Sequence, residues 1–290
     1  MTHVSARRGA LYVSVAATAW GTGGAAGVLL FETGGLGPVG VSLWRYLLGA
    51  AFLLALARRR PRGGLLTWRV LVVGAGMAVY QTAYFAAIAH SGVALATVVT
   101  MGATPVFTAL GSRFVLRERL GRVALAALAA ALAGLLLLTG ESVLQARASS
   151  VLGIAFALGS AAGYAGVTLF SRRHRDDDPQ SVSIGGFVVG AVCLAPFALA
   201  EGVVPELNWT SAWLLLYLGA VPTALAYGLF FRALTALRAT TVSIISLGEA
   251  VGAALLGVVL FGERLTAPAW AGCLLLLAAV TVLAARADAA

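Results

Sequence analysis

Ten apolar stretches, each long enough to cross a bilayer, follow one another along the chain with only short polar segments between them. They cover residues 9–31, 38–57, 68–89, 93–115, 122–139, 151–171, 181–200, 211–232, 239–261 and 268–285. A helix needs roughly 20 apolar residues to span the hydrocarbon core of a membrane. The pattern therefore predicts an all-α integral membrane protein of ten transmembrane helices, the third and fourth joined by a tight turn at His90-Ser91-Gly92.

Composition excludes several other classes of protein. Only 11% of the residues are charged, whereas a soluble domain carries about 25%. All 20 basic residues are arginines and the net charge is +9, but they form small clusters between apolar stretches, not a basic groove with interleaved aromatics. Cys193 and Cys273 each lie inside an apolar stretch. We therefore expect no nucleic-acid partner, no metal, no cofactor and no catalytic residues.

The arginines predict how the chain is oriented, because positively charged loops stay in the cytoplasm. With the N-terminus inside, 17 of the 20 arginines fall on inner segments, whereas the outer loops hold only Arg147 and Arg264. We expect a multi-pass protein of the plasma membrane with both termini cytoplasmic. The first apolar stretch is too long for a cleavable signal and is expected to remain on the chain.

An internal repeat appears when the sequence is shifted against itself by 145 residues. Ala109-Leu110 then falls on Ala254-Leu255, and Glu118-Arg119-Leu120 falls on Glu263-Arg264-Leu265. The chain divides into two halves of five helices, residues 1–145 and 146–290. Because five is odd, the second half must cross the membrane in the opposite sense from the first.

Inverted repeats are typical of carriers, because two similar halves that face opposite ways can exchange inward-open and outward-open shapes around a site near the middle of the membrane. The pattern favours a secondary transporter with a central cavity between the halves. Two alternatives remain: an intramembrane enzyme acting on a lipid or isoprenoid substrate, and a non-transporting scaffold. An enzyme would need a convergent acidic cluster, and the sequence offers a lone intramembrane acid.

At the repeated segments the sequence resembles the drug/metabolite transporter superfamily, in particular its EamA-type ten-helix members. The resemblance rests on Thr104-Pro105-Val106-Phe107 followed by Glu118-Arg119-Leu120, and on Gly248-Glu249-Ala250-Val251 followed by Gly262-Glu263-Arg264-Leu265. Trp20-Gly21 and Trp44-Arg45-Tyr46 also fit. Arg117 stands where the pattern usually has glycine. The resemblance implies a proton-coupled or facilitated carrier, often an exporter of amino acids, amines or related drug-like metabolites.

Polar and aromatic residues that recur every three or four positions mark the helix faces turned toward a cavity. The candidates for lining the substrate cavity are Trp20, Tyr80, Gln81, Tyr84, Thr97, Thr100, Met101, Thr104, Tyr164, Thr168, Tyr227, Ser243 and Ser246. Spans five and ten are almost purely Ala, Leu, Val and Gly. We expect these two helices at the periphery, facing lipid or a second subunit in a homodimer.

Two charged residues inside spans are candidates for coupling or for substrate recognition. Glu249 is an acid deep in a span, where a charge costs on the order of 2.5 to 3.5 kcal/mol. It is expected to be a proton-coupling site, a partner for a substrate ammonium, or a neutral acid that locks helix packing. Arg45 is expected to reach the membrane interface, to lock helices together, or to supply a fixed positive charge near the cavity.

Overall fold

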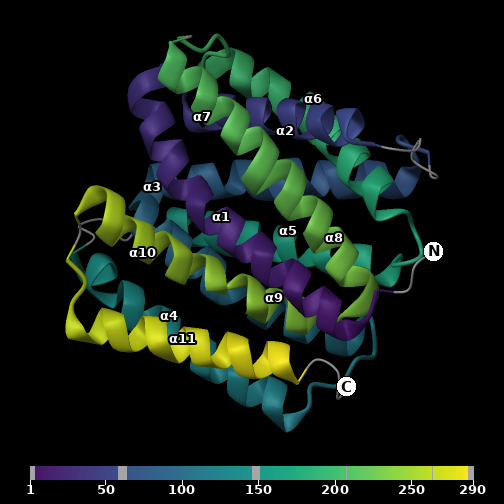
Figure 1. Cartoon of the computed structure of the whole chain (residues 1–290), viewed down its shortest axis with the longest axis vertical. Helices are drawn as coiled ribbons and strands as arrows, with labels where there is room; N and C mark the ends of the chain where they lie inside the picture. The colour runs from purple at the N-terminus through teal and green to yellow at the C-terminus, as the bar shows by residue number, and fades with distance from the viewer. Residues whose placement is uncertain (1–3, 58–63, 146–150, 207, 263, 287–290) are drawn as a thin grey trace.

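The computed structural model describes residues 4–57, 64–145, 151–206, 208–262 and 264–286, and the secondary structure of these residues is helical throughout (Figure 1). The helices are α1 (Ala6–Gly34), α2 (Pro38–Ala55), α3 (Trp68–Phe114), α4 (Arg122–Gln145), α5 (Val151–Arg173), α6 (Pro179–Glu201), α7 (Trp209–Gly219), η1 (Ala220–Leu225), α8 (Ala226–Ala236), α9 (Ala239–Ser246), α10 (Gly248–Phe261) and α11 (Ala267–Ala285).

These helices form the ten predicted spans. In the described residues nine segments are long and apolar enough to cross a membrane, and the 29-residue α1 is the tenth helix. The long α3 contains two spans, Trp68–Gly92 and Leu95–Phe114. They meet at Gly92, whose φ of 79° and ψ of 161° are not helical. These dihedral angles confirm the predicted turn at His90-Ser91-Gly92. Glycine adopts this conformation without steric cost.

Two spans are interrupted near the middle of the bundle. The eighth span consists of α7, the π-helical turn η1 and α8, and Pro222 in η1 cannot donate a backbone hydrogen bond. The ninth consists of α9 and α10, which are separated at Leu247. Such interruptions turn backbone and side-chain groups away from the regular helical pattern, and they occur frequently at functional sites.

The two halves pack crosswise. The second helices of the halves, α2 and α6, lie against each other, as do the fifth helices, α4 and α11. The first helix of each half packs on the third and fourth spans of the other: α1 on α8 and α10, and α5 on α3. Exchanging the halves reproduces the same set of neighbours, as expected for two inverted five-helix repeats.

The pair formed by α4 and α11 lies at one side of the molecule (Figure 1). Gly134 and Gly272 meet there, because a Cβ on Gly134 would be 2.8 Å from the Gly272 carbonyl oxygen and a Cβ on Gly272 would be 2.5 Å from that of Gly134. Small residues allow such close approach between membrane helices. The other faces of the pair expose residues such as Leu136 and Leu274. Their position at the periphery agrees with the sequence analysis, and the homodimer stays a prediction.

The start of α1 and the end of α11 lie at the same end of the bundle (Figure 1). The C-terminal ends of α5 and α8 lie at this end too (Figure 1); Arg172 and Arg173 are in the last turn of α5, and Arg232 is in α8. We call this end of the bundle the arginine-rich end. Arg58, Arg59, Arg60, Arg62, Arg147 and Glu263, which enter the predicted charge asymmetry or repeat, lie outside the described residues.

The turns that follow the fourth and ninth spans have the same backbone conformation. Arg117 has a φ of 56° and Gly262, 145 positions later, has a φ of 67°. Both values lie in the left-handed region, which is easy for glycine and strained for arginine. The structure therefore explains why glycine is usual at the position of Arg117, and it relates the two turns by the same 145-residue shift as the sequence.

Candidate functional site

Four of the predicted aromatic residues come together between the halves. The Tyr80 and Tyr227 hydroxyl oxygens are 2.6 Å apart and share a hydrogen bond. The Tyr164 ring meets the Tyr80 ring edge to face at a centroid distance of 5.2 Å, and the Trp20 ring meets the Tyr227 ring in the same way at 5.1 Å. These side chains come from α1, α3, α5 and α8. We call them, with the neighbours described next, the aromatic cluster.

Three further rings belong to the aromatic cluster and were missed by the sequence analysis. Phe187 of α6 lies 5.5 Å from Tyr227 and stacks on Tyr46 of α2 at 5.5 Å between centroids. Phe230 lies 5.5 Å from Trp20. The spacing of three residues between Tyr227 and Phe230 places both on one helix face and could have identified Phe230. Phe187 lies in an apolar helix that gives no such signal.

Two charged side chains flank the aromatic cluster. The Nε of Arg45, on α2, donates a hydrogen bond to Oγ1 of Thr223 in η1 at 3.2 Å. Glu249 lies in the first turn of α10, directly after the interruption at Leu247, and is partly buried. The Glu249 backbone lies against α1 next to Trp20, since a Cβ on Gly21 would be 2.7 Å from the Glu249 carbonyl oxygen. A basic and an acidic residue thus lie on helices that form or pack against the aromatic cluster.

Arg45 and Glu249 do not form a direct ion pair in the part of the chain that the structure describes. Arg45 is held by the Thr223 hydroxyl, whose own proton is donated to the Leu218 carbonyl oxygen at 2.6 Å. The contact supports the expectation that Arg45 connects helices. Since a hydroxyl does not neutralise the guanidinium, its charge remains available to a ligand.

Several buried polar atoms near the centre have no hydrogen-bond partner among the described residues. They are Nε1 of Trp20, the hydroxyl of Tyr46 and the hydroxyl of Ser243. Buried polar groups in native proteins are almost always satisfied by protein, water or ligand. Two donors on rings of the aromatic cluster and one hydroxyl on α9 are therefore suited to bind a polar solute or water.

Of the remaining candidate residues for the cavity, some lie near the site and others form hydrogen bonds between helices. Tyr84 shares a hydrogen bond of 2.6 Å with Thr97. In contrast, the Gln81 amide donates to Ser42 on α2 at 3.0 Å, and the Thr100 hydroxyl donates to the Ala157 carbonyl oxygen on α5 at 3.2 Å.

Hydroxyl groups that bond to their own helix, and one thioether, complete the candidates. Thr104, Thr168 and Ser246 each donate to the carbonyl oxygen four residues earlier, and Met101 packs against the main core. Such local bonds leave a hydroxyl satisfied without a ligand.

Burial along the polar faces of α3 and α9 increases toward the arginine-rich end. Thr97 and Met101 are partly buried, whereas Thr108 and Ser112 are fully buried. At this end the hydroxyl of Thr240, at the start of α9, donates to that of Ser112 at 3.1 Å. The two halves are thus in contact between the aromatic cluster and the arginine-rich end, and the polar side chains at this contact are buried.

Arginines of the second half also contribute to the contact between the halves at this end. Arg172 of α5 contacts the Glu118 carboxylate at 3.2 Å and donates to the Leu234 carbonyl oxygen at the end of α8 at 2.9 Å. Arg238 donates to the Arg119 carbonyl oxygen at 3.2 Å. These contacts join the turn that follows the fourth span to helices of the other half.

The opposite end is joined differently. The Glu201 carboxylate at the end of α6 accepts hydrogen bonds from the backbone N–H groups of Val39 and Gly40, each at 2.8 Å. Trp44 donates to the Val203 carbonyl oxygen at 2.8 Å. These contacts connect α2 with the end of α6 and the segment that follows it. Glu249 and Tyr84 are partly exposed.

The sequence of the chain is similar to proteins of bacteria and archaea. A Bacillus subtilis protein described as the uncharacterized transporter YwfM is 30% identical over 279 residues, which cover 95% of this chain and 93% of that protein. An uncharacterized transporter of Archaeoglobus fulgidus is 30% identical over 212 residues, 71% of this chain and 74% of that protein.

The fold also matches a solved structure titled only as the crystal structure of a protein. The TM-score is 0.83, the sequence identity is 23%, and the match covers 94% of this chain and 95% of the other. It establishes the fold alone.

The EamA-like transporter family matches the chain twice, at residues 7–140 and again at residues 151–285. Each match corresponds to five of the ten helices. The resemblance seen in the sequence is confirmed, and so is the predicted membrane-transporter class. The chain is a multi-pass membrane transporter that belongs to the EamA-like transporter family.

Proposed function

We propose that the chain is a secondary transporter that exports a small organic solute carrying an amine and a carboxylate, such as an amino acid or a related drug-like metabolite. It would act in the plasma membrane by alternating access, with both termini in the cytoplasm. The two halves, residues 1–145 and 146–290, would rock about the aromatic cluster. Export and the class of solute are what the family resemblance implies.

The observation that carries the proposal is the placement of Arg45 and Glu249. The two side chains have opposite charges, lie beside the same aromatic cluster and do not pair directly among the described residues. A guanidinium suits a carboxylate, and a carboxylate suits an ammonium. The rings of Trp20 and Tyr227 can hold a cation with about 0.5 to 2 kcal/mol.

Alternating access is supported by the contacts between the halves at the arginine-rich end. The contact between Ser112 and Thr240, with the contacts of Arg172 and Arg238, separates the aromatic cluster from this end. Glu249 is partly exposed. This arrangement corresponds to an outward-facing state. Rocking the halves would break these contacts and expose the same site to the cytoplasm.

The test is transport by the purified protein in proteoliposomes with a panel of labelled solutes. We expect flux of a subset of amino acids or amines without chemical change. Chemical conversion of a lipid would favour the alternative of an intramembrane enzyme. Equal leakage of every solute, or no flux of any, would contradict the proposal.

A second part of the experiment determines which group of the solute each of the two charged residues recognises. An amine analogue that lacks the carboxylate should depend on Glu249 but not on Arg45, and a carboxylic acid that lacks the amine should show the reverse. The variants are Glu249→Gln and Arg45→Gln, with Asp176→Asn as a matched control at an exposed position. Loss of both analogues in both variants would show that the charges only stabilise the fold.

A further inference from the structure

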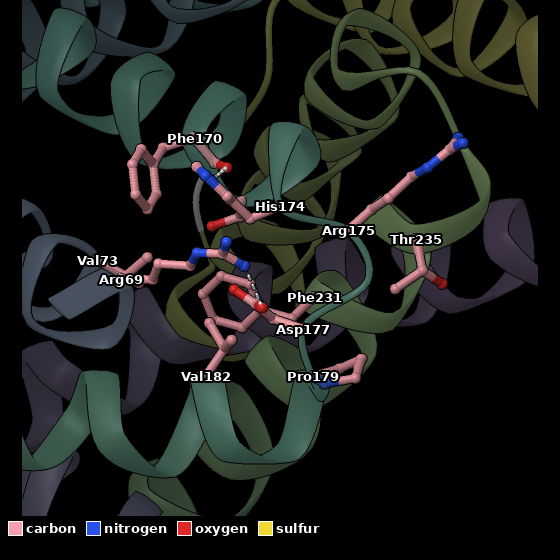
Figure 2. A pocket seen from close by; sticks show the side chains of 11 residues that line it. Arg69, Val73, Phe170, His174, Arg175, Asp177, Pro179, Val182, Phe231 and Thr235 are labelled. Atoms are coloured by element: carbon pink, nitrogen blue, oxygen red, sulfur yellow. Dashed lines mark hydrogen bonds and ion pairs between the residues drawn. The ribbon is translucent and has the colours of Figure 1, made fainter. Parts of the chain in front are cut away.

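The side chain of Arg45 is held by a neutral group. By contrast, the guanidinium of Arg69 lies beside a carboxylate, because Asp177 Oδ1 accepts from its Nη1 at 2.7 Å (Figure 2). Arg45 donates from Nε to Oγ1 of Thr223 at 3.2 Å. Its Nη1 and Nη2 form no hydrogen bond or ion pair with the residues that the structure describes. Two neighbouring donors of a charged group are thus left for a ligand.

The orientation of the Thr223 hydroxyl follows from the proline that precedes it. In a regular α-helix the Leu218 carbonyl oxygen would accept from the backbone N–H of residue 222. That residue is Pro222, which has no N–H. The Thr223 hydroxyl donates to the Leu218 oxygen instead, at 2.6 Å. Because its one proton is used there, the hydroxyl can meet Arg45 only as an acceptor.

Glycines bring the π-helical turn η1 close enough to α2 for this contact. Thr223 is fully buried. A Cβ on Gly49, four residues after Arg45 in α2, would be 2.7 Å from the Cγ2 methyl of Thr223. A Cβ on Gly219 would be 2.5 Å from the Cβ of Leu48. Small residues on both helices therefore allow the approach, and the methyl and the hydroxyl of Thr223 are each fixed by a neighbour.

The pair of Arg45 and Thr223 occurs in one arrangement of the halves only. Under the 145-residue shift Arg45 corresponds to Gly190, and Thr223 corresponds to Ala78. Neither of these counterparts has a side chain that can form a hydrogen bond. The packing of the repeat itself therefore does not require the pair. Tyr227 follows Thr223 by four residues in the eighth span, so that the pair lies beside the aromatic cluster.

We propose that Thr223 is the positioning residue for Arg45. By accepting from Nε, it leaves Nη1 and Nη2 as the pair of donors that meets the two oxygens of the solute carboxylate. A planar pair of donors suits a carboxylate in one orientation, which a lysine ammonium would not specify. The inference rests on the proposed function, which assigns the solute carboxylate to Arg45, and it adds the residue that orients the guanidinium.

Two variants of Thr223 separate its hydroxyl from its shape. Thr223→Val removes the hydroxyl and keeps the branched side chain, whereas Thr223→Ser keeps the hydroxyl. The matched control is Thr139→Val in the peripheral helix α4. Thr139 also donates to a backbone carbonyl oxygen of its own helix, that of Leu135, at 2.6 Å. Its loss therefore costs the same kind of hydrogen bond without touching Arg45.

The first measurement needs no solute. In full-length protein with isotopically labelled arginine in detergent, NMR follows the exchange of the Arg45 Nε–H with water. The signal is identified by its absence in Arg45→Gln. We expect protection from exchange in the parent protein, in Thr223→Ser and in Thr139→Val, and loss of protection in Thr223→Val. Unchanged protection in Thr223→Val, or no protection in the parent protein, would overturn the proposal.

The second measurement is the uptake of labelled leucine and phenylalanine into proteoliposomes, with unlabelled phenethylamine as a competitor that lacks a carboxylate. Thr223→Val should raise KM about tenfold, because a hydrogen bond to a charged group is lost, and should leave kcat nearly unchanged. Inhibition by phenethylamine should not change. Thr223→Ser and Thr139→Val should keep the KM of the parent protein.

The outcomes distinguish this inference from the proposed function. A KM that rises in Arg45→Gln but not in Thr223→Val would overturn the role of Thr223 alone. A KM that rises in neither variant would contradict the assignment of the carboxylate to Arg45, and the role of Thr223 with it. If neither amino acid is transported, the proposed solute class fails for these probes, and the NMR measurement still decides whether Thr223 holds Arg45.

Discussion

Glu249 occupies the first turn of a helix that begins inside the bundle. The apolar surroundings favour the neutral acid, whereas a nearby positive charge favours the ionised carboxylate. Arg45 adds a positive charge within electrostatic reach. A carboxyl group under such opposed influences can change its protonation when a charged solute arrives or when water reaches it.

Glu249→Gln is predicted to remove the pH dependence of transport, because an amide of nearly the same shape cannot bind and release a proton. The protein should still reach the membrane in normal amount. Uptake into proteoliposomes across a pH series measures the effect, with Asp176→Asn, at an exposed position, as the control. A pH profile unchanged from the parent protein would show that Glu249 serves only in helix packing.

Arg117→Gly is predicted to stabilise the protein by about 1 kcal/mol, because a φ of 56° is strained for arginine and free for glycine. The thermal unfolding midpoint in detergent should rise. Arg117→Ala removes the same charge and keeps the strain, so it should not produce the gain. An equal rise in both variants would assign the effect to charge and not to backbone conformation.

Among the elements, the α4 and α11 pair depends on a close approach of two backbones. Gly134→Ala is predicted to destabilise the protein by about 2 kcal/mol, because the added Cβ would meet the Gly272 carbonyl oxygen at 2.8 Å. Gly140→Ala lies on the same helix, where an added Cβ meets nothing within 4 Å, and should be neutral or slightly stabilising. Unfolding midpoints would distinguish them. Equal midpoints would mean that the pair is not tightly packed.

The elements also show what sequence could and could not predict. Apolar length predicted the spans, because a bilayer demands a nearly fixed number of residues per helix. The glycine at position 92 and the 145-residue shift predicted the turn and the halves. The separation of α9 from α10 at Leu247 was not predicted, because Leu247 itself carries no turn signal and the break depends on tertiary packing.

Within the candidate site, residues with a polar group could be identified from the sequence, whereas purely apolar residues could not. Tyr80 and Tyr227 stand out in apolar helices, whereas Phe187 looks like any core residue until α6 is packed on α2. Gln81 and Thr100 donate hydrogen bonds to other helices, and their place in the cavity stays a prediction, because helical spacing identifies a buried face without saying which neighbour it meets.

At the scale of the whole molecule, alternating access requires the two halves to separate and rejoin at the arginine-rich end. The hydrogen bond between Ser112 and Thr240 joins the fourth and ninth spans across the boundary between the halves. The 145-residue repeat does not relate Ser112 to Thr240. The two residues nevertheless meet where the polar faces of α3 and α9 are buried. If transport requires this end to open, the two residues must move apart in every cycle.

The most direct measurement is therefore transport by a protein with this contact locked. Cysteines replace Ser112 and Thr240 in a background that carries Cys193→Ala and Cys273→Ala, and flux into proteoliposomes is recorded after oxidation and again after reduction. The account predicts that oxidation stops transport, that reduction restores it, and that each single cysteine variant responds to neither treatment. Undiminished transport by the fully cross-linked protein would contradict the account.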